Sequence, residues 1–175
     1  MTVDDRLLAT DYLSGLEARP IEDIRAMRAE CVAVETGLSY LRRMVQGPLD
    51  IVNRELVRRE VGGHADRASL IEELPGILAD GPRPAGTGRL SQQLEPSSVD
   101  PELAAELDGI LAGGVVADVT SLDTADLAGL RSRLEVFEHR VSERRHAYFE
   151  RIDALGAELT RRYRTGEATV EGLLD

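Results

Sequence analysis

The chain has 175 residues, enough for one domain or two small ones, and carries a formal net charge of −11. Aromatic residues make up 3% and tryptophan is absent, so the apolar content comes from leucine, valine, isoleucine and alanine, which suits helix-on-helix packing better than a sheet. The negative charge argues against direct binding to DNA, because a nucleic acid backbone would repel it, and favours a basic protein surface as partner.

The first segment, residues 1–19, holds a short apolar stretch from Leu7 to Leu16 that predicts one or two helical turns. It lacks an apolar run of signal-peptide length, and no stretch of the chain approaches the length of a membrane span. We therefore expect a cytoplasmic protein without a membrane contact.

Residues 20–60 are predicted to form a first long helix. Pro20 suits a first helical turn, and Glu22 and Asp23 suit the positive end of a helix. Pro48 removes one backbone hydrogen bond, so we expect a bend there. Apolar residues recur three and four apart, as in the a/d seam of a coiled coil. The members of this seam are Ile24, Met27, Cys31, Val34, Leu38, Leu41, Val45 and Val52.

A linker and a short helix are predicted to follow. Residues 61–99 are rich in glycine and proline and predict a long flexible linker. Asp100 before Pro101 is typical of a helix start, so residues 100–114 are predicted to form a short helix. Its apolar side chains fit either a cover over the long helices or a docking surface, and its acidic character slightly favours a partner contact. These side chains are Leu103, Leu107, Ile110 and Leu111.

Residues 121–165 are predicted to form a second long helix, followed by a tail at 166–175. Arg144 and Arg151 occupy d positions, so this seam is more polar than the first. The sequence therefore predicts an all-α fold, an antiparallel two-helix coiled-coil hairpin with one or more additional short helices and a long flexible linker. The apolar members of the second seam are Leu127, Leu130, Leu134, Phe137, Val141, Tyr148 and Leu155.

A stripe of polar residues occurs in each long helix at the same offsets of 0, 4, 7, 11 and 15. At roughly 100° per residue these steps fall within an arc of about 80°, so each stripe lines one edge of its helix, beside the seam. In an antiparallel pair the two stripes would be related by an approximate two-fold axis. The first stripe is Glu35, Ser39, Arg42, Gln46 and Asp50, and the second is Glu138, Ser142, Arg145, Phe149 and Asp153.

Two interpretations of the stripes differ in function. Charged residues beside a seam are usually solvated flanks that select a partner helix, which favours a nucleotide-independent coiled-coil adaptor or oligomerisation module. Repetition of four identities in one order has a chance expectation on the order of one per cent, which favours a site for a polar, two-fold symmetric ligand. Carboxylates accept the N1–H and N2–H of guanine, and arginine donates to O6 and N7 or stacks on the ring.

The sequence contains no recognisable pattern of catalytic or metal-binding residues. Cys31 is the single cysteine and is expected to pack as a small hydrophobe. The three histidines, His64, His139 and His146, lack metal-ligand spacing, and the last two are expected to be exposed. Neither a Ser-His-Asp pattern nor a glycine-rich phosphate loop occurs, so we expect neither an enzyme nor a metal site.

The first stripe reads Glu-x3-Ser-x2-Arg-x3-Gln-x3-Asp and resembles the signature of actinobacterial anti-sigma factors of the RsiG type. The resemblance covers both long helices, and the second copy departs from it at Phe149, where glutamine is expected. It implies that two antiparallel helices hold cyclic di-GMP as an intercalated dimer, and that this form sequesters a WhiG-like sigma factor of the sporulation or flagellar type and blocks transcription. Both stripes would then supply the ligand-binding residues, with Phe149 packing on a guanine or ribose face.

Overall fold

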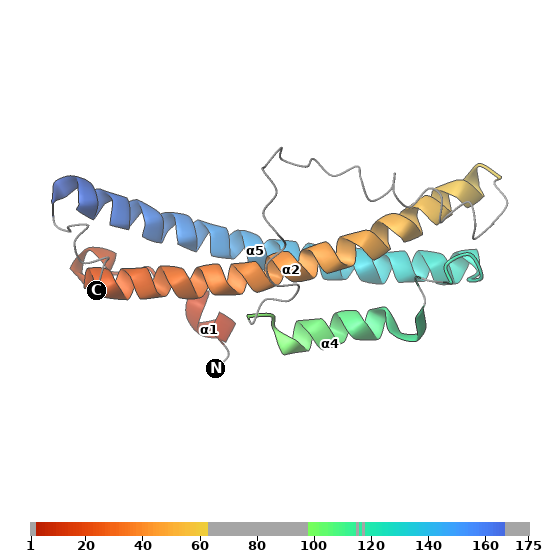
Figure 1. The fold of residues 1–175 in the computed structure, drawn as a ribbon, viewed down its shortest axis with the longest axis horizontal. Helices are drawn as coiled ribbons and strands as arrows, with labels where there is room; N and C mark the ends of the chain where they lie inside the picture. The colour runs from red at the N-terminus through yellow and green to blue at the C-terminus, as the bar shows by residue number, and fades with distance from the viewer. Residues whose placement is uncertain (1–2, 63–97, 115, 117, 167–175) are drawn as a thin grey trace, which may run out of the picture.

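Two long helices running in opposite directions form the body of the molecule (Figure 1). The computed structural model describes residues 3–62, 98–114, 116 and 118–166, and this part contains helices and turns without a strand. Helix α2 spans Ile21–Glu60 and α5 spans Thr124–Thr165. The all-α hairpin is confirmed, and none of the described helices is long and apolar enough to cross a membrane. The predicted linker from residue 63 to 97 and the tail from 167 lie outside the described residues.

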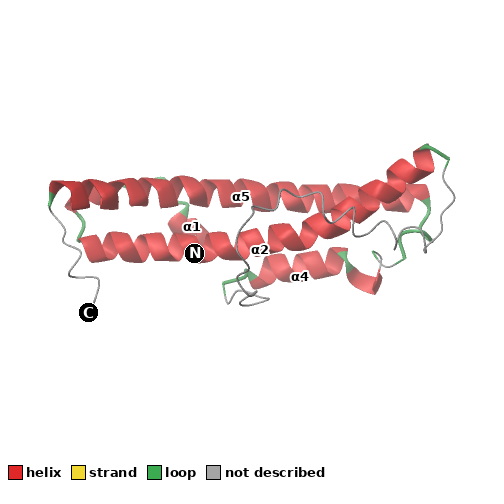
Figure 2. Cartoon of the chain, turned by 45° about the horizontal axis from the view of Figure 1, so that its top comes forward, coloured by secondary structure: helices red, strands yellow, loops and turns green. Residues whose placement is uncertain are grey.

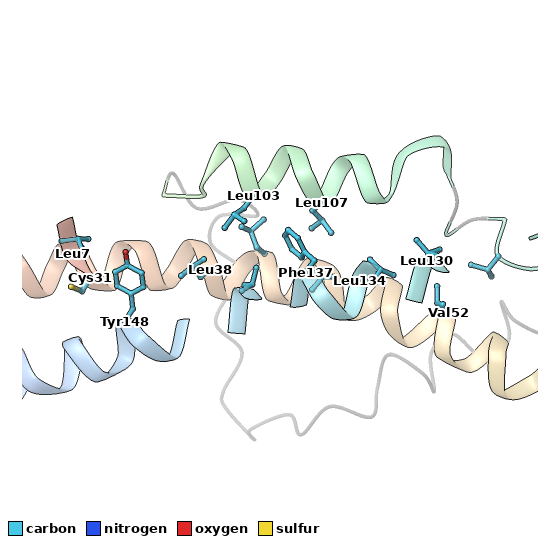
Figure 3. Close-up of a cluster of buried hydrophobic side chains, with 14 of the residues drawn as sticks. Leu7, Cys31, Leu38, Val52, Leu103, Leu107, Leu130, Leu134, Phe137 and Tyr148 are labelled. Atoms are coloured by element: carbon cyan, nitrogen blue, oxygen red, sulfur yellow. The ribbon is translucent and has the colours of Figure 1, made fainter. Parts of the chain in front are cut away.

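The core lies along the predicted seam between α2 and α5. Phe137 and Tyr148 are the largest side chains in it, and both are fully buried. Cys31 is buried without a disulfide, and burial raises the pKa of its thiol, as expected for a packed hydrophobe. Figure 3 shows Cys31 and Tyr148 meeting between the helices. Their burial follows from the heptad spacing, because a and d residues face the partner helix. The other fully or nearly fully buried members of the two helices are Ile24, Leu38, Leu41, Val45, Val52, Leu127, Leu130, Leu134, Val141 and Leu155.

The helix ends follow local chemistry. The carboxylate of Asp123 accepts a hydrogen bond from the Asp126 amide at 2.7 Å and caps α5, which ends at Gly166 in the left-handed conformation. Pro20 lies one residue before the first residue of α2 and not within its first turn. Pro48 does not interrupt α2, although Figure 1 shows its C-terminal half turning away from the line of its N-terminal half.

The N-terminal segment supplies the partners of the two polar seam positions. Helix α1 is only Val3–Leu7, and a 3-10 turn, η1, spans Leu16–Ala18, so the helical turns flank the apolar stretch and do not fill it. Arg144 forms an ion pair with Asp4, which also accepts a hydrogen bond from the Tyr148 hydroxyl at 2.6 Å. Arg151 donates to the backbone carbonyls of Leu7 and Leu8 at 2.7 and 2.9 Å. The two arginines therefore anchor the N-terminal segment to α5.

The short helix α4, Pro101–Ile110, covers the hairpin. Its N-cap Asp100 accepts hydrogen bonds from the Glu102 and Leu103 amides, as predicted, and a 3-10 turn, η2, follows at Ala112–Gly114. Leu103 and Leu107 are buried and point toward the seam (Figure 3), so the slight preference for a partner contact on this face was wrong. The acidic character of the helix favoured a partner contact, but its leucines are buried against the long helices, because removing apolar surface from water is favourable.

Gly37 allows the chain before α4 to approach α2 closely. A Cβ atom at Gly37 would collide with the backbone carbonyl of Ser98, so a larger side chain there would push the start of α4 outward. Figures 1 and 2 show α4 running beside the long pair, and its N-cap Asp100 lies near Arg144, which also binds α1. Both short helices therefore occupy one flank of the hairpin.

An arginine-rich clamp closes each end of the hairpin in the same way. At one end Glu55 binds Arg58 and Arg59, and Arg59 donates to the carbonyls of Val119 and Thr120, just before α5. Burial alone would raise the pKa of Glu55, but the hydrogen bonds from the two arginines lower this pKa below its ordinary value.

The second clamp is the sequence repeat of the first. Glu158 binds Arg161 and Arg162, and these hydrogen bonds lower the pKa of Glu158 to about 2. Arg162 donates to the carbonyls of Leu16 and Arg19 at 2.7 Å, just before α2. Each long helix thus ends in Glu-x2-Arg-Arg and ties the segment that precedes its partner, which fixes the antiparallel register from both ends.

Glu55→Gln should destabilise the protein, because the fully buried carboxylate is the common acceptor of two arginines. We expect a loss of about 3 kcal/mol in the free energy of unfolding, near the lower end for breaking a buried ion pair. Urea unfolding followed by circular dichroism measures it. Glu143→Gln, in an exposed pair with His139, is the control and should cost at most about 0.5 kcal/mol. Equal losses in both variants would contradict the clamp.

Candidate functional site

The two polar stripes meet across the hairpin through their first three members. The Arg145 Nε donates to Glu35 Oε1 at 2.9 Å and to Ser39 Oγ at 2.8 Å. Ser39 in turn donates to the same carboxylate oxygen at 2.5 Å. An arginine from α5 is therefore bound by a glutamate and a serine that lie one turn apart on α2.

The reciprocal arrangement is present with the roles of the helices exchanged. The Arg42 Nε donates to Glu138 Oε1 and to Ser142 Oγ, both at 3.0 Å, and Ser142 donates to Glu138 at 2.8 Å. We call the six residues of both halves the reciprocal cluster. Its approximate two-fold symmetry follows from placing the same sequence on two antiparallel helices, as the stripes predicted.

The reciprocal cluster is half-buried and leaves much of its hydrogen-bonding capacity unused. The Glu35 and Glu138 side chains are 15% and 23% exposed. Within the described residues, Arg42 and Arg145 form hydrogen bonds only through Nε, and the two glutamates accept only through Oε1. The terminal guanidinium nitrogens and the Oε2 atoms are thus left to bind an additional molecule, with donors and acceptors side by side.

Phe149 breaks the symmetry of the two halves. The guanidinium of Arg145 lies over the Phe149 ring, 4.5 Å from its centroid, in cation–π geometry. Gln46, the equivalent residue on α2, is half-buried and carries an amide that can donate and accept. Arg145 therefore stacks on an aromatic ring, whereas the equivalent position near Arg42 carries the amide of Gln46.

The two aspartates lie apart from the reciprocal cluster. Asp50 and Asp153 are exposed, and neither forms an ion pair with a described residue. Desolvation by its surroundings raises the pKa of Asp50 above its ordinary value. Because the helices are antiparallel, these carboxylates stand near opposite ends of the paired stripes.

The flank that carries the stripes is opposite the flank covered by α1 and α4. A hollow of about 940 Å³ lies on the covered flank, where Asp4, Val34, Leu103 and Arg144 are among its lining residues. Its arginines are already engaged, since Arg144 pairs with Asp4 and Arg140 pairs with Glu106. The stripe flank therefore offers the more available set of polar groups, and sequence reasoning missed the hollow because it depends on how α4 packs.

Neither of the two described histidines takes part in the reciprocal cluster or the hollow. His139 and His146 are exposed, as expected, and each pairs with a glutamate one turn later. His64 lies outside the described residues. In the part of the chain that the structure describes, no group of three or more histidine, cysteine, aspartate or glutamate side chains is placed to hold a metal ion.

These features define an antiparallel helical hairpin with an internally duplicated polar flank. The model of the RsiG-like family matches residues 10–78 and 114–175, which include both long helices. The chain belongs to the RsiG-like family, which supports a role as an anti-sigma factor and hence a sigma factor as partner. The family is one of regulators and not of enzymes. No curated protein matches the chain.

Arg145→Ala and Glu35→Gln should be energetically coupled, because Glu35→Gln removes the negative charge that Arg145 binds at 2.9 Å. A double-mutant cycle in urea should give a coupling energy of about 1 kcal/mol, as for a partly exposed charged hydrogen bond. A cycle of Arg145→Ala with Glu106→Gln, on the other flank, should be additive. Additive behaviour in both cycles would show that the reciprocal cluster does not form in solution.

Proposed function

We propose that this anti-sigma factor binds cyclic di-GMP, as an intercalated dimer, on the flank shared by α2 and α5. In that form it sequesters a WhiG-like sigma factor of the sporulation or flagellar type and blocks transcription. The observation that carries the proposal is the reciprocal cluster, in which each helix supplies the same three side chains to the other. A dimer of a two-fold symmetric dinucleotide is a ligand of matching symmetry.

The unused atoms of the site suit guanine and phosphate. The terminal nitrogens of Arg42 and Arg145 form a planar fork that can donate to guanine O6 and N7 or to a phosphate. Oε2 of Glu35 and of Glu138 can accept from guanine N1–H and N2–H, which only guanine among the common bases presents together. Asp50 and Asp153 can accept the same guanine hydrogens at the two ends of the paired stripes. Gln46 can bind phosphate or ribose without adding charge. Phe149 can pack on a guanine or ribose face in its half of the site.

Coupling between the ligand and the sigma factor does not require an open hairpin. The seam is packed, and Arg144 and Arg151 are bound by the N-terminal segment. The ligand would instead change the stripe flank, where it adds phosphates and covers polar groups. If the sigma factor contacts this altered flank, each partner must strengthen the binding of the other by the same factor, about 5–150-fold for typical couplings.

A second function is favoured by one observation. Arginine, glutamate and serine in the reciprocal cluster already bind each other, which is also what a nucleotide-independent coiled-coil adaptor would need to set its register. That alternative places no demand on the unused guanidinium nitrogens or on Asp50. It therefore predicts that partner binding is the same with and without nucleotide.

Calorimetric titration with cyclic di-GMP distinguishes the two functions. We expect binding by the native protein and a loss of about 10–100-fold in affinity for Arg42→Ala and for Arg145→Ala, since each removes charge-assisted hydrogen bonds. Arg133→Ala, on α5 but outside the stripe, is the matched control. The titration is repeated with the sigma factor present, where the affinity should rise. Heat-silent titrations, with sigma factor binding unchanged by nucleotide, would instead support the adaptor.

A further inference from the structure

The repeat that forms the stripes extends one step beyond them. Arg28 stands seven residues before Glu35, and Arg131 stands seven residues before Glu138. Seven residues return to within about 20° of the same helix edge, so both arginines continue their stripes. Each stripe therefore begins with an arginine and ends with an aspartate.

The antiparallel register brings the arginine of each stripe to the aspartate end of the other. The Nε of Arg28 lies 3.8 Å from the position that a Cβ atom would take at Gly156, three residues after Asp153. Arg28 thus reaches across the stripe flank to α5. By the same register, Arg131 stands opposite the turn that contains Asp50.

Both guanidinium groups retain the capacity to bind a ligand. Arg28 is exposed and forms neither a hydrogen bond nor an ion pair with a described residue. Among the described residues, the buried Nε of Arg131 makes no hydrogen bond, and the ion pair of Arg131 with Glu135 at 3.5 Å joins side chains that are 42% and 49% exposed. Such an exposed pair contributes little and can be exchanged for a phosphate.

Additional cations would offset the net negative charge of the two five-residue stripes. The two five-residue stripes contain four carboxylates, Glu35, Asp50, Glu138 and Asp153, and only two guanidinium groups. This excess of negative charge would repel the phosphodiester groups of a dinucleotide. The next two stripe positions, Arg28 and Arg131, balance it and place positive charge at both ends of the site.

We propose that Arg28 and Arg131 are binding residues of the ligand site and that each takes a phosphodiester group of a guanine dinucleotide at one end. The proposal rests on the proposed function, since it assigns the ligand's phosphates to this flank. Each end then pairs an arginine for phosphate with an aspartate of the other helix for a guanine edge. The site is accordingly longer than the two five-residue stripes and is made of six positions on each helix.

The test compares Arg28→Gln, Arg131→Gln and the double variant with the native full-length protein, in calorimetric titrations with cyclic di-GMP at low and high salt. Each single variant should bind roughly tenfold more weakly, and the double variant roughly a hundredfold, because distant sites act additively. The native protein should lose more affinity with added salt than the double variant, since exposed charges are screened. Arg133→Gln, an exposed arginine outside the stripes, is the control and should change neither quantity.

The outcomes separate this inference from the proposed function. Native binding with unchanged affinity and salt dependence in the double variant would overturn the role of Arg28 and Arg131 alone. Absence of native binding would overturn both. We expect the ligand-free variants to keep the native melting temperature, because neither side chain makes a strong contact in the free protein. With unchanged melting temperatures, a loss of affinity is a property of the ligand site and not of the fold.

Discussion

The antiparallel register of α2 and α5 is the constraint on which the rest of the structure depends. In this register Arg42 meets Glu138 and Ser142 while Arg145 meets Glu35 and Ser39. A slip by one heptad would preserve the apolar seam but would separate every one of these pairs. Apolar packing alone does not choose between such registers, so the polar flank and the two Glu-x2-Arg-Arg clamps supply the specificity.

The two flanks of the hairpin have different roles. On one flank, α1 and α4 pack against the seam, and Asp4 engages Arg144 and Tyr148. On the other flank, the described residues outside α2 and α5 make no hydrogen bond to either stripe. The short helices α1 and α4 therefore stabilise the helix pair on one flank and leave the stripe flank uncovered. A ligand bound to the stripe flank would therefore not compete for the contacts that α1 and α4 make with the helix pair.

Features that depend on local spacing could be predicted from the sequence. The heptads gave both long helices, and the repeated offsets brought six stripe residues together. The anchoring of the N-terminal segment could not be predicted, because Arg144 and Arg151 bind a carboxylate and backbone carbonyls that are distant in the chain. Carbonyl acceptors carry no sequence signature. The Glu-x2-Arg-Arg motif of the clamps occurs twice in the sequence, but its function depends on Arg59 and Arg162 reaching backbone carbonyls just before the opposite helix, which the sequence does not indicate.

In the proposed function, one ligand engages both halves of the stripe flank at once. The side-chain Nε–Hε resonances of Arg42 and Arg145, assigned by nuclear magnetic resonance from the corresponding single variants, report this most directly. On addition of cyclic di-GMP we predict that both resonances shift together, with the same midpoint. Resonances that stay in place, or a shift confined to one arginine, would contradict a shared site between the two helices.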